Sequence, residues 1–170
     1  MLDQKQHEGV TLRARPVFGL VDEVSVEQKF KLLDLYARYT WAYDCSDEDG
    51  FVDNFTPNAV VIGHDDEHVG HDAIRLWFRY LLGLRRFDRT LWQHLSYQQR
   101  FHGDDRTCHV FGYATHFYAE PDNRQLGVRS AGYYVDKCVN VDGVWLFQQH
   151  SVNSWNESCV PWKQPRWAID

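Results

Sequence analysis

The hydrophobic pattern changes along the chain, and this change constrains the fold more than any other feature of the sequence. From Leu91 onward, long segments rich in Tyr, Val, Phe and Thr are separated by turn sequences at 103–105, 121–123 and 142–143. This pattern is typical of antiparallel strands joined by hairpins. The part before Leu91 has helical spacing. We therefore predict an α+β domain, in which helices cover one face of a cone-shaped, curved antiparallel sheet and leave a closed-ended pocket between them.

A helix is predicted at the start of the domain. Ser25 and Gln28 form a Ser-x-x-Gln capping box, and helical spacing follows to about Cys45. The stripe expected to face the core consists of Phe30, Leu33, Ala37 and Trp41. The next step of three along this stripe is Asp44, and a carboxylate on a core-facing stripe requires a partner or a cavity.

Shorter elements complete the first half of the chain, with proline and glycine near their boundaries. The expected elements are a short helix at 50–55, a buried strand at 59–62, a charged loop at 63–71 and a helix from Asp72 to about Arg86.

The size and composition of the chain predict one domain. Its 170 residues, of which 44% are hydrophobic and 15% aromatic, suffice for a substantial core. We expect an arm at 1–23, the domain at 24–157 and a tail at 158–170. The tail contains Trp162 and Trp167, so we expect it to close the cavity mouth or to pack on another subunit of a dimer or trimer.

Charge and hydropathy exclude several classes of partner. The net charge is −6, and no run of basic residues exceeds the Arg85-Arg86 pair, so a nucleic-acid partner is not expected. No segment approaches the roughly 18 apolar residues that a membrane span requires, and we expect a soluble, cytoplasmic protein.

Sequence motifs for cofactors and covalent catalysis are also absent. The sequence has no Gly-x-Ser-x-Gly motif, phosphate loop or dinucleotide fingerprint. The four widely spaced cysteines indicate neither a zinc site nor a disulfide framework; they are Cys45, Cys108, Cys138 and Cys159. We expect no cofactor and no metal.

Asp44 and His94 are the strongest candidates for chemistry. A histidine can take and return a proton near neutral pH, while a carboxylate on its other nitrogen fixes the tautomer and stabilises the imidazolium. Neighbouring tyrosines could donate hydrogen bonds to an enolate; Tyr36, Tyr39 and Tyr43 lie on the same helix as Asp44.

Each candidate also has a structural alternative. Asp44 can cap the following short helix, and His94 can be a hydrogen-bonded strand residue whose face the alternation leaves open. The histidines and carboxylates of 64–71 suit either a divalent metal or a solvated loop. Any of the other strand histidines could line the pocket; these are His109, His116 and His150.

Several segments together resemble SnoaL-like proteins of the nuclear-transport-factor-two-like superfamily. The match covers roughly residues 25–157, and it implies a cystatin-like α+β barrel. The segments that carry it are 35–44, 51–61, the Gly-x-x-x-Ile start at 70–74, Gln93-His94, 132–136 and 141–145.

This resemblance implies roles for individual residues. Asp44 and His94 match the catalytic pair of scytalone dehydratase and bile-acid dehydratases, in which a tyrosine corresponds to Tyr43 or Tyr39 respectively. His116 matches the second dehydratase histidine weakly. Ser130 aligns with a substrate-contacting serine, whereas Gly132 replaces the neighbouring asparagine and argues against scytalone itself. The residues expected to bind substrate are Tyr36, Trp41, Trp92, His116 and Ser130.

We therefore hypothesise a cofactor-independent lyase of the dehydratase type, which eliminates water from a polyketide-like or steroid-like hydroxy-carbonyl compound. An isomerase or cyclase could use the same Asp44 and His94 pair, and a non-catalytic module that binds small ligands or dimerises is the alternative from another class. The fold itself does not decide the reaction.

Overall fold

The computed structural model describes residues 23–63, 66–88, 91–120 and 125–154. The expected tail and all of the expected arm except Glu23 lie outside these residues. Over the described ranges, the chain forms three helices and one six-stranded sheet. None of these helices combines the length and the hydropathy needed for a membrane crossing.

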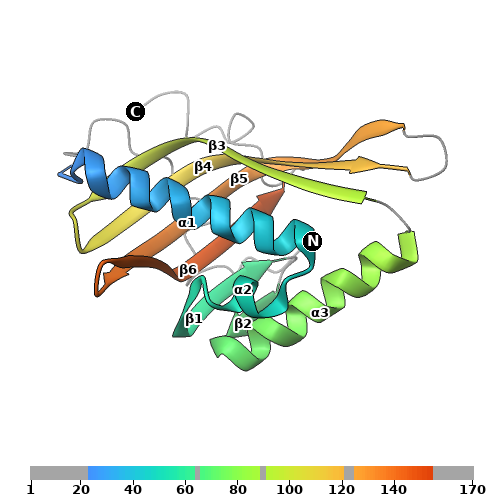
Figure 1. The fold of residues 1–170 in the computed structure, drawn as a ribbon, viewed down its shortest axis with the longest axis horizontal. Coiled ribbons are helices and arrows are strands. Elements are labelled where there is room, and N and C mark those ends of the chain that lie inside the picture. The colour runs from blue at the N-terminus through green and yellow to red at the C-terminus, as the bar shows by residue number, and fades with distance from the viewer. Residues whose placement is uncertain (1–22, 64–65, 89–90, 121–124, 155–170) are drawn as a thin grey trace, which may run out of the picture.

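The sheet has the strand order β2-β1-β6-β5-β4-β3. Its strands are β1 (Phe55–Gly63), β2 (Asp66–Val69), β3 (Leu91–Gly103), β4 (Thr107–Ala119), β5 (Leu126–Val141) and β6 (Val144–Ser154). All neighbours pair antiparallel except β1 and β6, which pair in parallel. The predicted α+β class and the curved sheet are confirmed, and the four long strands β3 to β6 form most of the sheet (Figure 1).

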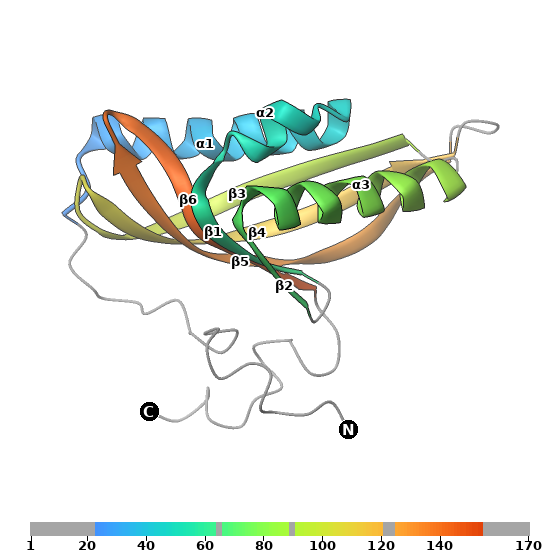
Figure 2. The ribbon, with the colours of Figure 1, turned by 90° about the horizontal axis from the view of Figure 1, so that it is seen from below.

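Three helices lie on one side of this curved sheet (Figure 2); they are α1 (Val26–Cys45), α2 (Glu48–Val52) and α3 (Gly70–Asp88). Helix α1 begins as predicted, because the Ser25 hydroxyl accepts a hydrogen bond from the Gln28 amide at 3.4 Å. It ends at Cys45 and is followed by the capping residue Ser46, whose φ of 61° lies in the left-handed region. Helix α1 crosses the sheet, while α3 packs beside β1 and β2 (Figure 1).

The predicted inner face of α1 is wrong. Phe30 and Trp41 are 69% and 71% exposed, and Leu33 is also exposed. The face that packs on the sheet is instead rich in tyrosine; its buried members are Leu32, Leu35, Tyr36, Tyr39, Thr40, Ala42 and Tyr43. The helix thus has two stripes with helical spacing, and the tyrosine stripe is buried because its large rings pack while its hydroxyls find polar partners or a cavity.

Three shorter elements differ from their predicted bounds. Helix α2 begins at Glu48, because the Asp47 carboxylate accepts a hydrogen bond from the Gly50 amide at 3.0 Å. Strand β1 already begins at Phe55, and Pro57, which was expected to end the preceding helix, lies within this strand where the register with β6 shifts. Part of the predicted charged loop is strand β2, which pairs with β1.

The core between the helices and the sheet is a cluster of aromatic rings. Phe51 of α2 is at its centre: its ring stacks on Phe78 of α3, with 4.2 Å between centroids, and contacts Tyr39 of α1 at 5.1 Å. Phe51 is fully buried. This five-residue helix therefore connects the two long helices through one side chain.

The substitution Phe51→Ala should lower the free energy of unfolding by about 3 to 5 kcal/mol, because it removes a buried ring and leaves a cavity. Phe30→Ala is the matched control on the exposed stripe of α1, and it should change stability by less than about 0.5 kcal/mol. Urea denaturation followed by circular dichroism measures both values. A larger loss for Phe30→Ala than for Phe51→Ala would contradict the assignment of the two faces.

Candidate active site

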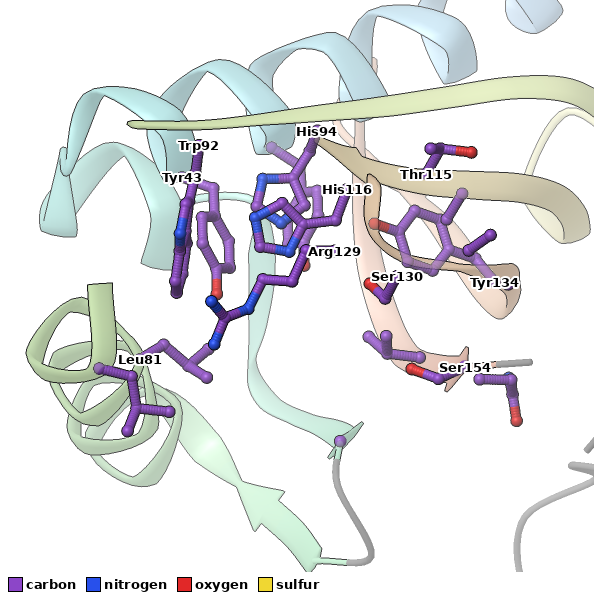
Figure 3. A pocket seen from close by; sticks show the side chains of 18 of the residues that line it. Tyr43, Leu81, Trp92, His94, Thr115, His116, Arg129, Ser130, Tyr134 and Ser154 are labelled. Atoms are coloured by element: carbon purple, nitrogen blue, oxygen red, sulfur yellow. The ribbon is translucent and has the colours of Figure 1, made fainter. Parts of the chain in front are cut away.

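A cavity of about 280 Å³ lies between the helices and the concave face of the sheet. Helix α1 contributes Tyr39 and Tyr43 to its wall, and α3 contributes Trp77 and Leu81. The strands supply the remaining walls. Their lining residues include Trp92, His94, Thr115, His116, Arg129, Ser130 and Tyr134 (Figure 3).

Asp44 holds His94 at this cavity through two hydrogen bonds. One carboxylate oxygen, Oδ1, lies 2.7 Å from His94 Nδ1, and the other, Oδ2, accepts the main-chain N–H of His94 at 2.9 Å. The carboxylate favours a proton on Nδ1, which leaves Nε2 on the opposite side of the ring to act as a base. The side chains are 18% and 11% exposed, so the pair is largely shielded from water.

Local structure explains why both residues face inward. Asp44 lies one helical turn after the buried Thr40, on the tyrosine stripe rather than on the predicted one. On β3, Trp92, His94 and Ser96 are less exposed than the residues between them. This alternation resolves the face of His94 that the sequence left open.

A second histidine stacks on the first. His116 on β4 pairs in register with His94 on β3, and the centroids of their rings lie 4.2 Å apart at an interplanar angle of 20°. Burial lowers the pKa of His116 to about 3, with smaller contributions from the charges of His94, Arg129 and Arg85. His116 is therefore neutral at physiological pH. Its Nε2 is buried and has no hydrogen-bond partner among the described atoms.

Three tyrosines supply hydroxyl groups around the same cavity. Tyr39, Tyr43 and Tyr134 line it, and burial is the main cause that raises the pKa of each. All three are therefore protonated hydrogen-bond donors at neutral pH. The Tyr43 ring also contacts the His94 ring, with 4.2 Å between centroids.

The structure brings most of the sequence-predicted residues together at the cavity. Asp44 reaches it through His94, and the following residues line it directly: Tyr39, Tyr43, Trp92, His94, His116 and Ser130. Two residues do not line it. Trp41 lies on the outer face of α1, and the Tyr36 hydroxyl instead donates a hydrogen bond to the buried carboxylate of Asp136. Trp41 belonged to the stripe that was wrongly expected to face the core, whereas Tyr36 was a candidate because it lies on the same helix as Asp44.

Sequence reasoning missed Tyr134 and Arg129. Tyr134 was detectable, because strand alternation puts Ser130, Gly132 and Tyr134 on one face of β5. Arg129 was not detectable in this way, because in a regular strand it would face away from Ser130.

A second aspartate and histidine pair lies behind the cavity. Asp136 Oδ1 is 2.8 Å from His150 Nδ1, and both side chains are completely buried. The rings of Tyr39 and Tyr134 each lie 4.7 Å from the His150 ring and separate it from the cavity. This pair therefore belongs to the core and not to the cavity wall.

The histidines around β2 make separate structural contacts. The His68 ring stacks on Trp77 at 5.3 Å between centroids, and His71 Nε2 lies 2.9 Å from the carbonyl oxygen of Phe55. Among the residues that the structure describes, no group of three or more His, Cys, Asp or Glu side chains is arranged to hold a metal ion. His64 and Asp65 lie outside those residues.

Comparison with known proteins identifies the family. The model of the SnoaL-like domain matches residues 24–150, and the chain belongs to this family. A search of curated proteins gives no match.

Solved structures with the same fold include several from bacteria. Aln2 from a Streptomyces species is 24% identical, with a TM-score of 0.69 over 76% of this chain and 91% of that one. A proposed scytalone dehydratase from Novosphingobium aromaticivorans is 17% identical, with a TM-score of 0.66 over 77% and 86%. A Nostoc punctiforme protein of unknown function with a cystatin-like fold is 17% identical, with a TM-score of 0.67 over 78% and 95%. These identities establish the fold alone.

We predict that His116 does not titrate between about pH 5 and pH 8, the range in which an ordinary histidine changes charge. Its pKa in the folded state lies below that of the unfolded chain. As pH falls, His116 therefore binds a proton in the unfolded chain before it does so in the folded protein. Below about pH 6.5 this difference lowers the free energy of unfolding. Two-dimensional NMR of the imidazole resonances measures this, with His116→Gln to assign the signal. A midpoint near the ordinary histidine value would contradict it.

Proposed function

We propose that this protein is a cofactor-independent dehydratase that eliminates water from a small hydroxy-carbonyl compound. The observation that carries the proposal is the Asp44 and His94 pair. Asp44 binds Nδ1 of the His94 ring and leaves Nε2 to act as the base, and His94 lines the same cavity as the protonated tyrosines. Membership in the SnoaL-like family and the likeness to a proposed scytalone dehydratase support the same class of reaction.

The reaction begins with proton removal. His94 Nε2 takes a proton from the carbon next to the substrate carbonyl, and the electron pair of that bond moves into the carbonyl to form an enolate. Asp44 stabilises the imidazolium that results. A tyrosine hydroxyl donates a hydrogen bond to the enolate oxygen, where negative charge develops.

The second step expels the hydroxyl group. The enolate re-forms the carbonyl, a carbon–carbon double bond forms, and the bond to the β-hydroxyl breaks. The imidazolium of His94 gives its proton to the leaving hydroxyl, which departs as water and restores the neutral base. His116 is too weakly basic to act as a cationic acid, so its role in this scheme is to position the hydroxyl by hydrogen bonding.

The polarity of the cavity supports an enzyme over a carrier of apolar ligands. A carrier needs no base, whereas this cavity contains an imidazole whose tautomer is fixed by a carboxylate and whose neighbours are hydrogen-bond donors. An isomerase or cyclase would use the same proton abstraction and differ in where the proton or the carbanion goes next.

His94→Gln should lower kcat/KM for water loss by about 10² to 10⁴, because it removes the general base. The probe is 3-hydroxy-1-tetralone, a β-hydroxy ketone that loses water to give fluorescent 1-naphthol, and the control is His109→Gln on the exposed side of β4. We expect the control to keep full activity. Full turnover in a folded His94→Gln variant would reject the mechanism, and absence of turnover by the native protein on a panel of β-hydroxy ketones would reject the dehydratase assignment.

Tyr134→Phe should lower kcat by about 10²-fold with little change in KM, because it removes a donor to the developing oxyanion. Tyr113→Phe, on the neighbouring strand but 44% exposed, is its matched control. Steady-state kinetics with the same probe distinguish the two. An equal effect of both substitutions, or a change confined to KM, would count against Tyr134 as an oxyanion donor.

A further inference from the structure

Helix α1 has a second apolar surface, on the side that faces away from the core. All members of this outer stripe are exposed, and they are Val26, Phe30, Leu33, Ala37 and Trp41. Figure 2 shows the sheet on one side of α1 only, and the exposure of the stripe means that no described element covers its other side. An apolar stripe with helical spacing is typical of a helix that packs against a partner.

Two aromatic rings give the outer stripe most of its area. Phe30 and Trp41 are 69% and 71% exposed, so together they leave roughly 200–350 Å² of surface in water, given about 150–250 Å² for a whole aromatic side chain. With the smaller members and the polar side chains beside them, two such stripes in contact would bury on the order of 1,000 Å². This area is near the lower limit of specific interfaces.

The order of side-chain sizes makes the outer stripe complementary to a second copy that runs the opposite way. Two α1 helices that pack antiparallel about a point next to Leu33 place Phe30 opposite Ala37 of the second copy. The same alignment places Trp41 opposite Val26. Each large ring then meets a small side chain, so the helices can approach closely and the rings can interdigitate. A parallel pairing would instead put each ring against itself.

The charges beside the stripe have the same antiparallel complementarity. They alternate in sign along α1, in the order Glu27, Lys31, Asp34 and Arg38. Within one chain, Lys31 Nζ lies 3.0 Å from Glu27 Oε1. Arg38 Nε lies 3.1 Å from Asp34 Oδ2. Reversing the order exchanges the signs, so an antiparallel copy puts opposite charges next to each other at every position, whereas a parallel copy would put like charges together.

These observations favour a second copy over a membrane surface. The four flanking charges cancel, whereas helices that lie on membranes are rich in Lys and Arg on their polar face. We propose that two copies of this chain pack their α1 helices antiparallel through the outer stripe, about a two-fold axis next to Leu33. This contact is independent of the proposed reaction, because none of the stripe side chains lines the cavity.

Sedimentation velocity of the full chain over a concentration series tests the proposal. The native chain should form a dimer with a Kd of about 1 to 100 μM, as expected for an interface near the lower size limit. Phe30→Glu should raise this Kd by about tenfold or more, because it places a carboxylate in an apolar contact. Leu76→Glu is the matched control on the exposed face of α3, and it should keep the native Kd.

Charge variants test the antiparallel arrangement. Lys31→Glu and Asp34→Lys should each weaken the dimer, because each puts like charges next to each other. An equimolar mixture of the two variants should associate more tightly than either variant alone, since the heterodimer has opposite charges at both contacts. Arg38 is left unchanged, because its guanidinium also donates hydrogen bonds to Asn54 Oδ1 and to the carbonyl oxygen of Trp145.

Circular dichroism checks the folding of each variant, and Trp41→Glu replaces Phe30→Glu if that protein does not fold. The urea comparison of Phe30→Ala with Phe51→Ala is run below the dimer Kd, so that dissociation does not contribute to the measured stability.

Several outcomes would overturn the proposal. They are a native chain that stays monomeric up to about 1 mM, an unchanged Kd for the folded stripe variant, an equal loss for Leu76→Glu, and a mixture of charge variants no tighter than its components. Binding of a monomeric native chain to phosphatidylserine vesicles, lost in Phe30→Glu, would assign the outer stripe to a membrane and reject the dimer.

Discussion

The carboxylate of Asp44 joins the end of α1 to the start of β3, and the arrangement of the cavity depends on this contact. Its two oxygens bind the main chain and the ring of the same residue, His94, so they fix both the position of the strand and the tautomer of the imidazole ring. His94 in turn stacks on His116 and makes a tilted ring contact with Tyr43. The last turn of one helix therefore determines the geometry of a wall built from three elements.

The two Asp and His pairs of this protein show how burial separates structure from chemistry. In both pairs a carboxylate oxygen lies within hydrogen-bond distance of the histidine Nδ1, but Asp136 and His150 are packed behind Tyr39 and Tyr134. A sealed pair has no access to a ligand, so it contributes to packing and to the satisfaction of buried polar groups. Residue types and their spacing do not distinguish the two cases.

Local patterns in the sequence determined the α+β class, the helix start at Ser25, the long strands after Leu91 and the candidacy of Asp44 and His94, because periodicity, capping and turn residues act over a few positions. The family resemblance added the cystatin-like fold.

Tertiary structure decided the rest. It buried the tyrosine stripe of α1 instead of the stripe with Phe30 and Trp41, since the choice between two apolar faces depends on what the sheet can accommodate. It also turned Arg129 inward through a bulge, which depends on the register between β4 and β5 and leaves no trace in the alternation of β5 alone.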